Sequence, residues 1–149
     1  MKMYFEDLEE GRVFKGDECI ADREEMLDYA RKNDPSPFHL DEEAAGNSPY
    51  GGLIASGGYT VTLWYRSGIP ILASIAFLGG FEWHIKLPVP VRPGDRLRAE
   101  VEIVSKRPSS KPGRGYVTTL QRILNQDSQA VFTCEVVWMI ATRPSQSNC

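Results

Sequence analysis

An acid and an imidazole stand five positions apart, at Asp34 and His39, in the segment Asp-Pro-Ser-Pro-Phe-His. Each proline fixes its own φ at about −65° and favours extended geometry in the residue before it, so we expect a stiff, non-helical segment. A rigid acid–imidazole pair can share one water, because one group accepts a proton while the other orients the water and delivers a proton. The pattern indicates general acid–base chemistry. The alternative is a surface turn that carries an Asp and a His incidentally.

A glycine-rich stretch and an apolar run follow downstream. Gly51 and Gly52 precede residues 53–64, which are apolar nearly all round and include Ser56 and Gly57. If this run is helical, the helix is buried. The first turn of a helix carries unpaired N–H groups and partial positive charge, which suit a developing oxyanion. The alternative is a core helix whose glycines only permit close packing.

Taken together, these segments resemble the MaoC-like family of hot-dog-fold hydratases and dehydratases, which includes the R-specific enoyl-CoA hydratases. The family pattern Asp-x-Asn-Pro-(aliphatic)-His-x-Asp corresponds to residues 34–41, and its Phe/Tyr-Gly-x-x-Ile-Ala/Val-x-Gly helix start to residues 50–57. An aromatic-acidic opening at residues 4–11 and a Pro-Val-x-x-Gly-Asp turn at residues 90–95 also match. The resemblance therefore runs over most of the chain.

The chain departs from the family pattern near the acid and at the helix start. Pro35 follows the acid directly, and Ser36 stands where the family has Asn. Ser56 precedes Gly57 where many enoyl-CoA hydratases have His. Because serine is shorter than asparagine, the hydrogen bond that Asn makes in the family must be made differently here or through water.

The resemblance implies an α+β protein with a single hot-dog domain over residues 1–149, in which a curved antiparallel β-sheet wraps around a long central α-helix. It implies that Asp34 and His39 are catalytic, and that Gly57, with Ser56 and Ser36, binds the substrate or its oxyanion. The expected activity is reversible, R-specific water addition across the C2=C3 bond of a 2-enoyl thioester of coenzyme A or an acyl carrier protein. A homodimer or dimer-based oligomer is implied, with the acyl tunnel between protomers. No metal or redox cofactor is expected.

Two other functions fit the same scaffold. A hot-dog thioesterase directs water at the thioester carbonyl and usually relies on an acid from the central helix, yet residues 53–66 contain no acid. A non-catalytic acyl-CoA-binding module is the second alternative. Such a module would not need Asp34 and His39.

Alternation of apolar and polar residues predicts the sheet. We expect strands near residues 11–20 and over 76–87, 96–106, 116–124 and 130–142, with Cys134 in the core. Alternation also places Phe81 and Trp83 on one face of their strand, with His84 on the opposite face as a surface or interface residue. Asp22 and Glu25 provide an N-cap and a capping-box partner for a helix through Ala30 that ends near Asp34.

Charge and composition exclude several classes of protein. The net charge of −3 and pI near 5.4 argue against nucleic-acid binding, which calls for a basic face. No apolar run has the length of a membrane span, and residues 1–7 have no signal-peptide core, so we expect a cytoplasmic protein that does not bind membranes. Three cysteines without Cys-x-x-Cys spacing indicate neither a disulfide framework nor a zinc site.

One basic segment stands out in this acidic chain. Residues 106–114 carry four positive charges and are expected to form a hairpin loop. This loop is either a solvated turn or a contact for coenzyme A phosphates or an acidic carrier protein.

Overall fold

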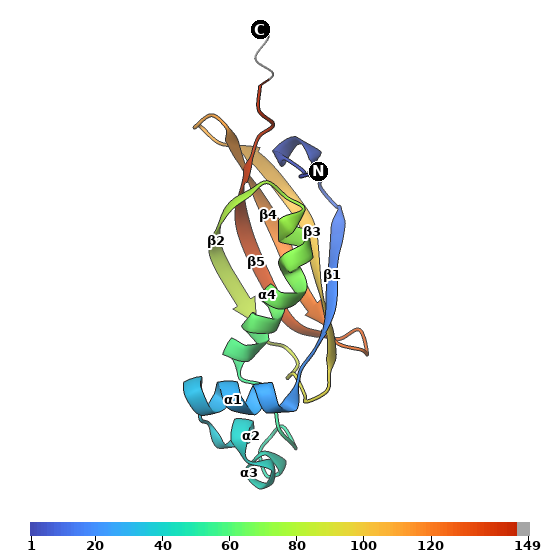
Figure 1. Cartoon of the computed structure of the whole chain (residues 1–149), viewed down its shortest axis with the longest axis vertical. Helices are drawn as coiled ribbons and strands as arrows, with labels where there is room; N and C mark the ends of the chain where they lie inside the picture. Colours follow the sequence, from blue (N-terminus) through green and yellow to red (C-terminus); the bar gives the residue numbers. More distant parts are fainter. Residues whose placement is uncertain (146–149) are drawn as a thin grey trace.

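A computed structural model describes residues 1–145 of the chain. A five-stranded antiparallel sheet curves around one long helix, α4, and three shorter helices lie beyond one end of the sheet (Figure 1). The strands are β1 (Val13–Ile20), β2 (Phe77–Lys86), β3 (Arg96–Pro108), β4 (Arg114–Leu124) and β5 (Ala130–Ala141), in the order β1-β3-β4-β5-β2. The helices are η1 (Phe5–Asp7), α1 (Arg23–Asn33), α2 (Pro37–Leu40), α3 (Glu42–Gly46) and α4 (Gly57–Ala73). The predicted α+β class and the sheet wrapped around a central helix are confirmed.

The core lies between α4 and the concave face of the sheet. Residues of β4 alternate between buried and half-buried positions along the whole strand, as a sheet covered on one face requires. Leu63 of α4 and Phe132 and Cys134 of β5 are completely buried in this layer. The alternating strands predicted from the sequence therefore turn their apolar faces towards α4, which covers them.

The helix boundaries agree with the sequence at α1 and differ at α2 and α4. Asp22 caps α1 through a 2.9 Å bond from the Glu25 backbone N–H, and the helix ends at Asn33. The segment 34–39 is helical in part, because Pro37 occupies the first position of α2, where a missing N–H costs no hydrogen bond. The expectation of a wholly non-helical segment was wrong. Residues 53–56 are non-helical, and α4 begins only at Gly57.

A β-bulge changes which side chains of β2 face the helix. The register shifts between Phe81 and Trp83, and the intervening Glu82 has a positive φ of 54°. As a result, Phe81 contacts Tyr116, whereas Trp83 packs edge-on against Trp64 of α4. The prediction that Phe81 and Trp83 share a face was wrong. A bulge inserts one extra residue into the strand, and the side chains on either side of it no longer follow simple alternation.

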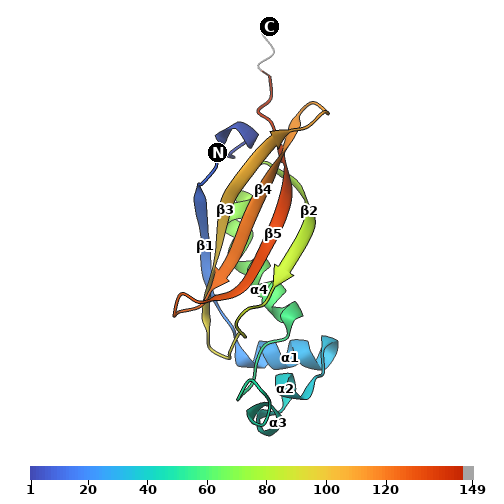
Figure 2. The same ribbon diagram turned by 180° about the vertical axis from the view of Figure 1, so that it is seen from behind.

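The two ends of the sheet have different character. Seen from behind, the sheet covers α4, with α1, α2 and α3 below one end and the β3–β4 hairpin at the opposite end (Figure 2). Lys106 of the hairpin donates to the Phe5 carbonyl at 2.8 Å, and the Arg107 guanidinium lies 4.3 Å from the centre of the Tyr116 ring. Arg114 also contacts Met139, so three of the four basic side chains of residues 106–114 contact the protein itself. None of the helices in the described residues is long and apolar enough to cross a membrane.

Candidate active site

Asp34 is delivered by the end of α1. Its backbone N–H donates to the Ala30 carbonyl at 2.9 Å, and its φ and ψ of −155° and 79° turn the chain out of the helix. Ser36, which precedes Pro37, is extended at φ −62° and ψ 138°, as the following proline requires. The two prolines therefore hold Asp34 and Ser36 outside helical geometry, as predicted.

His39 lies on α2 with its ring 7% exposed. Its Nδ1 lies 2.8 Å from the Ile54 carbonyl oxygen, and its Nε2 lies 3.1 Å from Oδ2 of Asp34. A carbonyl only accepts hydrogen bonds, so Nδ1 carries a hydrogen. Ile54 belongs to the non-helical residues before α4, so this segment orients the imidazole through the Ile54 carbonyl.

Two serine hydroxyls hold the Asp34 carboxylate. Ser36 Oγ donates to Oδ1 at 2.8 Å, and Ser56 Oγ donates to Oδ2 at 2.9 Å. The hydrogen bonds from Ser36 and then Ser56 lower the pKa of Asp34, with the nearby His39 acting in the same direction and partial burial opposing them. Asp34 is therefore held as a carboxylate at neutral pH. The sequence placed both serines at the site but indicated the substrate, rather than Asp34, as their partner.

The contact between Nε2 of His39 and Oδ2 of Asp34 requires one proton. Nδ1 already uses a hydrogen on Ile54, and a carboxylate oxygen only accepts, so a direct 3.1 Å hydrogen bond needs a hydrogen between Nε2 and Oδ2. When Nε2 carries that hydrogen, the pair contains one group that can give a proton, the imidazole, and one that can accept a proton, the Asp34 carboxylate.

His39 and Gly57 line one pocket of about 290 Å³ at the start of α4. Gly57 is the first residue of that helix, so its N–H belongs to the turn whose donors have no intrahelical acceptor. A Cβ at position 57 would approach Leu87 Cδ1 to 2.9 Å, so the Leu87 side chain lies directly over Gly57. The pocket places His39, the partner of Asp34, beside a helix N-terminus suited to a negatively charged oxygen.

Three of the five predicted site residues contact a fourth, Asp34, and the fifth, Gly57, lines a pocket together with His39. Asp34, His39, Ser36 and Ser56 are joined by hydrogen bonds, and Gly57 faces the cavity beside His39. Sequence reasoning missed Leu87, for which the sequence carries no signal beyond an apolar residue at a strand end. It also missed Thr60, which lies one turn after Gly57.

The other residues considered in the sequence lie elsewhere. His84 is exposed on β2 opposite Glu135, so it belongs to the surface as predicted. Cys134 is completely buried, Cys19 is half-buried, and Cys149 falls outside the described residues. Among residues 1–145, no group of three His, Cys, Asp or Glu side chains is placed to hold a metal ion.

Comparison with known proteins identifies the family. The family described as "MaoC like domain" matches residues 8–123, and the chain belongs to it. The MaoC-like dehydratase of Rhodospirillum rubrum has a crystal structure with a TM-score of 0.85 and 33% sequence identity, covering 95% of this chain and 99% of that one. The fold is the hot-dog fold of that family.

Two more relatives extend the comparison. The uncharacterized protein YdeM of Bacillus subtilis (strain 168) is 30% identical over 143 residues, which make up 93% of this chain and 99% of YdeM. The (R)-hydratase of A. caviae, described as involved in PHA biosynthesis, has 25% identity and a TM-score of 0.66, covering 92% of this chain and 98% of that one.

Proposed function

We propose that the protein is an R-specific hydratase that adds water reversibly across the C2=C3 bond of a 2-enoyl thioester. The observation that carries this proposal is the Asp34–His39 pair, joined at 3.1 Å beside a pocket that also contains the first residue of α4. Membership of a family that includes dehydratases supports it, as does the (R)-hydratase of A. caviae. The R stereochemistry rests on that likeness.

The proposed hydration uses the two groups of the pair for two different protons. The Asp34 carboxylate accepts a proton from water as the water oxygen bonds to C3. Nε2 of His39 orients the water and then gives its proton to C2, which completes the addition. The proton held by Asp34 returns to His39 across the 3.1 Å contact, so the pair ends as it began.

Negative charge develops on the thioester oxygen when C3 is attacked. The Gly57 N–H, in the positive first turn of α4, is the proposed donor to this oxygen, and such a donor typically lowers a barrier by about 3 kcal/mol. The side chain of Leu87 lies over Gly57. The thioester is the substrate, and the proposed reaction uses no metal or redox cofactor.

A homodimer completes the proposal. In the described residues β2 is an edge strand, and it carries several exposed apolar side chains. The edge strand also offers unpaired backbone groups to a second copy. We propose that two copies associate along β2 and that the thioester, of coenzyme A or of an acyl carrier protein, binds at this interface.

The test separates hydration from hydrolysis. Loss of enoyl absorbance from crotonyl-CoA, the 2-enoyl thioester of four carbons, reports water addition, and thiol release from saturated butyryl-CoA reports hydrolysis. We expect the first signal without the second, and we expect His39→Ala to abolish the first. Lys15→Ala, which truncates an exposed side chain on β1 at the opposite edge of the sheet from β2, is the control and should retain activity. Thiol release that survives His39→Ala would contradict the hydratase and favour a thioesterase.

A further inference from the structure

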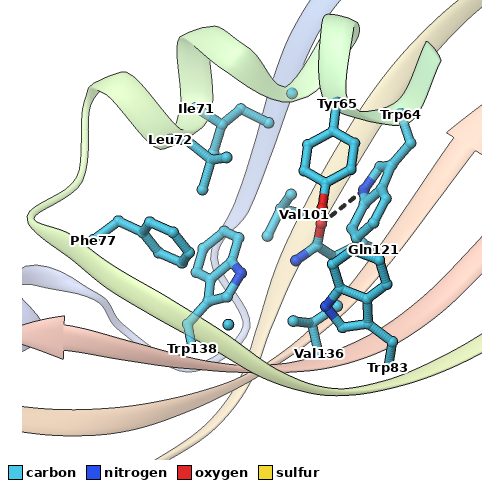
Figure 3. Close-up of a pocket in the computed structure, with 12 residues that line it drawn as sticks. Trp64, Tyr65, Ile71, Leu72, Phe77, Trp83, Val101, Gln121, Val136 and Trp138 are labelled. Atoms are coloured by element: carbon cyan, nitrogen blue, oxygen red, sulfur yellow. Dashed lines mark hydrogen bonds between the residues drawn. The ribbon is translucent and has the colours of Figure 1, made fainter. Parts of the chain in front are cut away.

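A second cavity of about 290 Å³ lies between α4 and the sheet, away from His39 and Gly57. Indoles of Trp64, Trp83 and Trp138 and the ring of Phe77 surround it, with Ile71 at its helix side (Figure 3). We call this cavity the aromatic pocket. Its walls come from α4, β2 and β5, so the fold itself shapes it.

Two glycines keep the aromatic pocket open. A Cβ built on Gly68 of α4 would meet no atom within 4 Å, and a Cβ on Gly80 of β2 would make only ordinary contacts of 3.7–3.9 Å. Neither position has a positive φ that would demand glycine. Glycine in a helix interior costs about 1 kcal/mol relative to alanine. The absence of a side chain at position 68 therefore lowers stability and preserves space.

The wall formed by Trp64 is held in place. Its Nε1 donates to Oε1 of Gln121 at 2.8 Å, and its ring packs on Phe132 with the centroids 4.9 Å apart. Gln121 is itself fixed, because its Nε2 donates to Thr119 at 2.9 Å. This wall of the pocket is therefore fixed by a buried hydrogen-bond network and by ring packing.

The aromatic pocket continues the line of the candidate active site along α4. Gly57, Thr60, Trp64, Gly68 and Ile71 follow one another at intervals of three or four residues, so they share one face of the helix. The first two line the site pocket and the last three line the aromatic pocket. Trp64 stands between them. From Thr60 to Gly68 the helix rises roughly 12 Å.

We propose that the aromatic pocket accepts the far end of the acyl group and selects substrates that carry an aromatic ring there. The inference rests on the proposed hydratase and names its substrate class as ω-aryl 2-enoyl thioesters. Aromatic walls favour a ring through edge-to-face and offset contacts, which an alkyl end of equal length cannot make. Because Thr60 of the site pocket and Trp64 of the aromatic pocket lie about 6 Å apart along the helix, several carbons must lie between C3 and the ring.

Matched thioesters test this selectivity. Crotonyl-CoA is too short to reach the aromatic pocket, whereas 8-cyclohexyl-2-octenoyl-CoA and 8-phenyl-2-octenoyl-CoA reach it with a saturated or an aromatic ring of the same carbon number. We expect kcat/KM for the phenyl compound to exceed that for the cyclohexyl compound by roughly three- to tenfold, the range that one or two aromatic contacts supply. Equal or lower values for the phenyl compound would overturn the proposal.

Substitutions at position 68 test whether the selectivity comes from this cavity. Gly68→Leu fills the pocket, and we expect the phenyl compound to lose at least tenfold in kcat/KM while crotonyl-CoA stays within twofold. Gly68→Ala adds one methyl group in open space, so it folds in any case and should show a smaller loss in the same direction. Ala73→Leu adds the same bulk at an exposed position of α4 and should leave all three values unchanged. Parallel losses for all three thioesters would overturn the proposal.

A binding measurement keeps this proposal separate from the hydratase. Saturated 8-phenyloctanoyl-CoA has no double bond to hydrate, and its ring would quench or shift the fluorescence of the three tryptophans around the pocket. Quenching that is lost in Gly68→Leu supports the aromatic pocket even if crotonyl-CoA is not hydrated, a result that would contradict only the hydratase. If the protein hydrates crotonyl-CoA but its fluorescence does not change when 8-phenyloctanoyl-CoA is added, the proposed role of the aromatic pocket is overturned and the hydratase is not.

Discussion

At the residue scale, the proposed chemistry depends on which groups form hydrogen bonds with Asp34 and with His39. The Ile54 carbonyl lies against Nδ1 of the imidazole, and Asp34 faces Nε2, so each ring nitrogen has one defined partner. Ser36 and Ser56 stabilise the negative form of Asp34 at the same time. Ser36, which stands where the family pattern has asparagine, thus reaches Asp34 by a direct hydrogen bond.

Removal of the Asp34 charge should stop turnover without unfolding the protein. Asp34→Asn retains the shape of the side chain but cannot accept the water proton, so we expect kcat for crotonyl-CoA hydration to fall by on the order of 10²–10⁴. Asp28→Asn is the matched control, because it removes an exposed carboxylate of the same helix that pairs only with Lys32. Circular dichroism should be native for both variants. Hydration at the wild-type rate by Asp34→Asn would remove this residue from the site.

The serine donors should set the titration of Asp34. Hydrogen bonds to a carboxylate favour its charged form, so Ser36→Ala or Ser56→Ala should raise the pKa of Asp34 towards its ordinary value. Carboxyl-carbon NMR titration measures this directly. Ser48→Ala is a suitable control, since the Ser48 hydroxyl bonds to the Ala45 carbonyl instead. An unchanged titration in both site variants would contradict the role given to the hydroxyls.

The same pKa shift has a consequence for stability. Because the pKa of Asp34 is lower in the folded protein than in the unfolded chain, the ionised carboxylate stabilises the fold above its ordinary pKa. This contribution is lost as the pH falls through the lowered value. Acid unfolding of Ser36→Ala should therefore begin at a higher pH than that of the wild type, as followed by circular dichroism.

At the scale of elements, the end of α1, the short helix α2 and the start of α4 meet at the site. The end of α1 provides Asp34, α2 provides His39, and the start of α4 provides Ser56 and Gly57. The family pattern predicted these residues together because two motifs carry all of them. The exact start of α4 could not be predicted, because residues 53–64 are apolar throughout and periodicity alone does not show where a helix begins.

Features that depend on packing between distant elements were not predictable from the sequence. The bulge at Glu82 reverses the expected orientation of Phe81 and depends on the register between β2 and β5. The aromatic pocket similarly requires Trp64, Trp83 and Trp138 to meet, although they belong to three elements. Gly68 was the one available signal, since a glycine inside a helix costs stability and calls for a reason.

A close contact between β1 and α4 gives a test at this scale. A Cβ on Gly16 of β1 would collide with the backbone carbonyl of Ser67, and the Ser67 hydroxyl donates to the Asp17 carbonyl at this crossing. We expect Gly16→Ala to lower the free energy of unfolding by about 1–3 kcal/mol, because the backbone must shift to admit the methyl group. Urea unfolding with an unchanged m-value would measure the loss.

The neighbouring glycine provides the comparison. Gly68→Ala makes the same chemical change one residue after Ser67, but into open space and within a helix, so it should raise the free energy of unfolding by up to about 1 kcal/mol. Equal effects of the two substitutions would contradict the close approach of β1 to α4.

At the scale of the whole molecule, apolar residues are exposed along one side. Most of the large exposed apolar side chains belong to β2 and to the neighbouring part of α4, among them Ile69, Leu78, Phe81 and Trp83. A monomer in water rarely leaves so many contiguous apolar side chains uncovered. An isologous pairing of β2 with β2 of a second copy would bury this side and satisfy the edge of the sheet.

Association through this side predicts how charged substitutions act. Leu78 is 51% exposed on β2, and Val104 is 47% exposed on β3, at a distance from that edge in the strand order. A glutamate buried in an interface lacks a partner and costs several kcal/mol, so Leu78→Glu should convert a dimer to a monomer, whereas Val104→Glu should leave the dimer intact. Light scattering over a concentration series measures both. Because the thioester is proposed to bind between the two copies, crotonyl-CoA hydration should fall with the dimer fraction in Leu78→Glu and remain unchanged in Val104→Glu. A monomeric wild type with full activity would contradict both the β2 interface and a shared site.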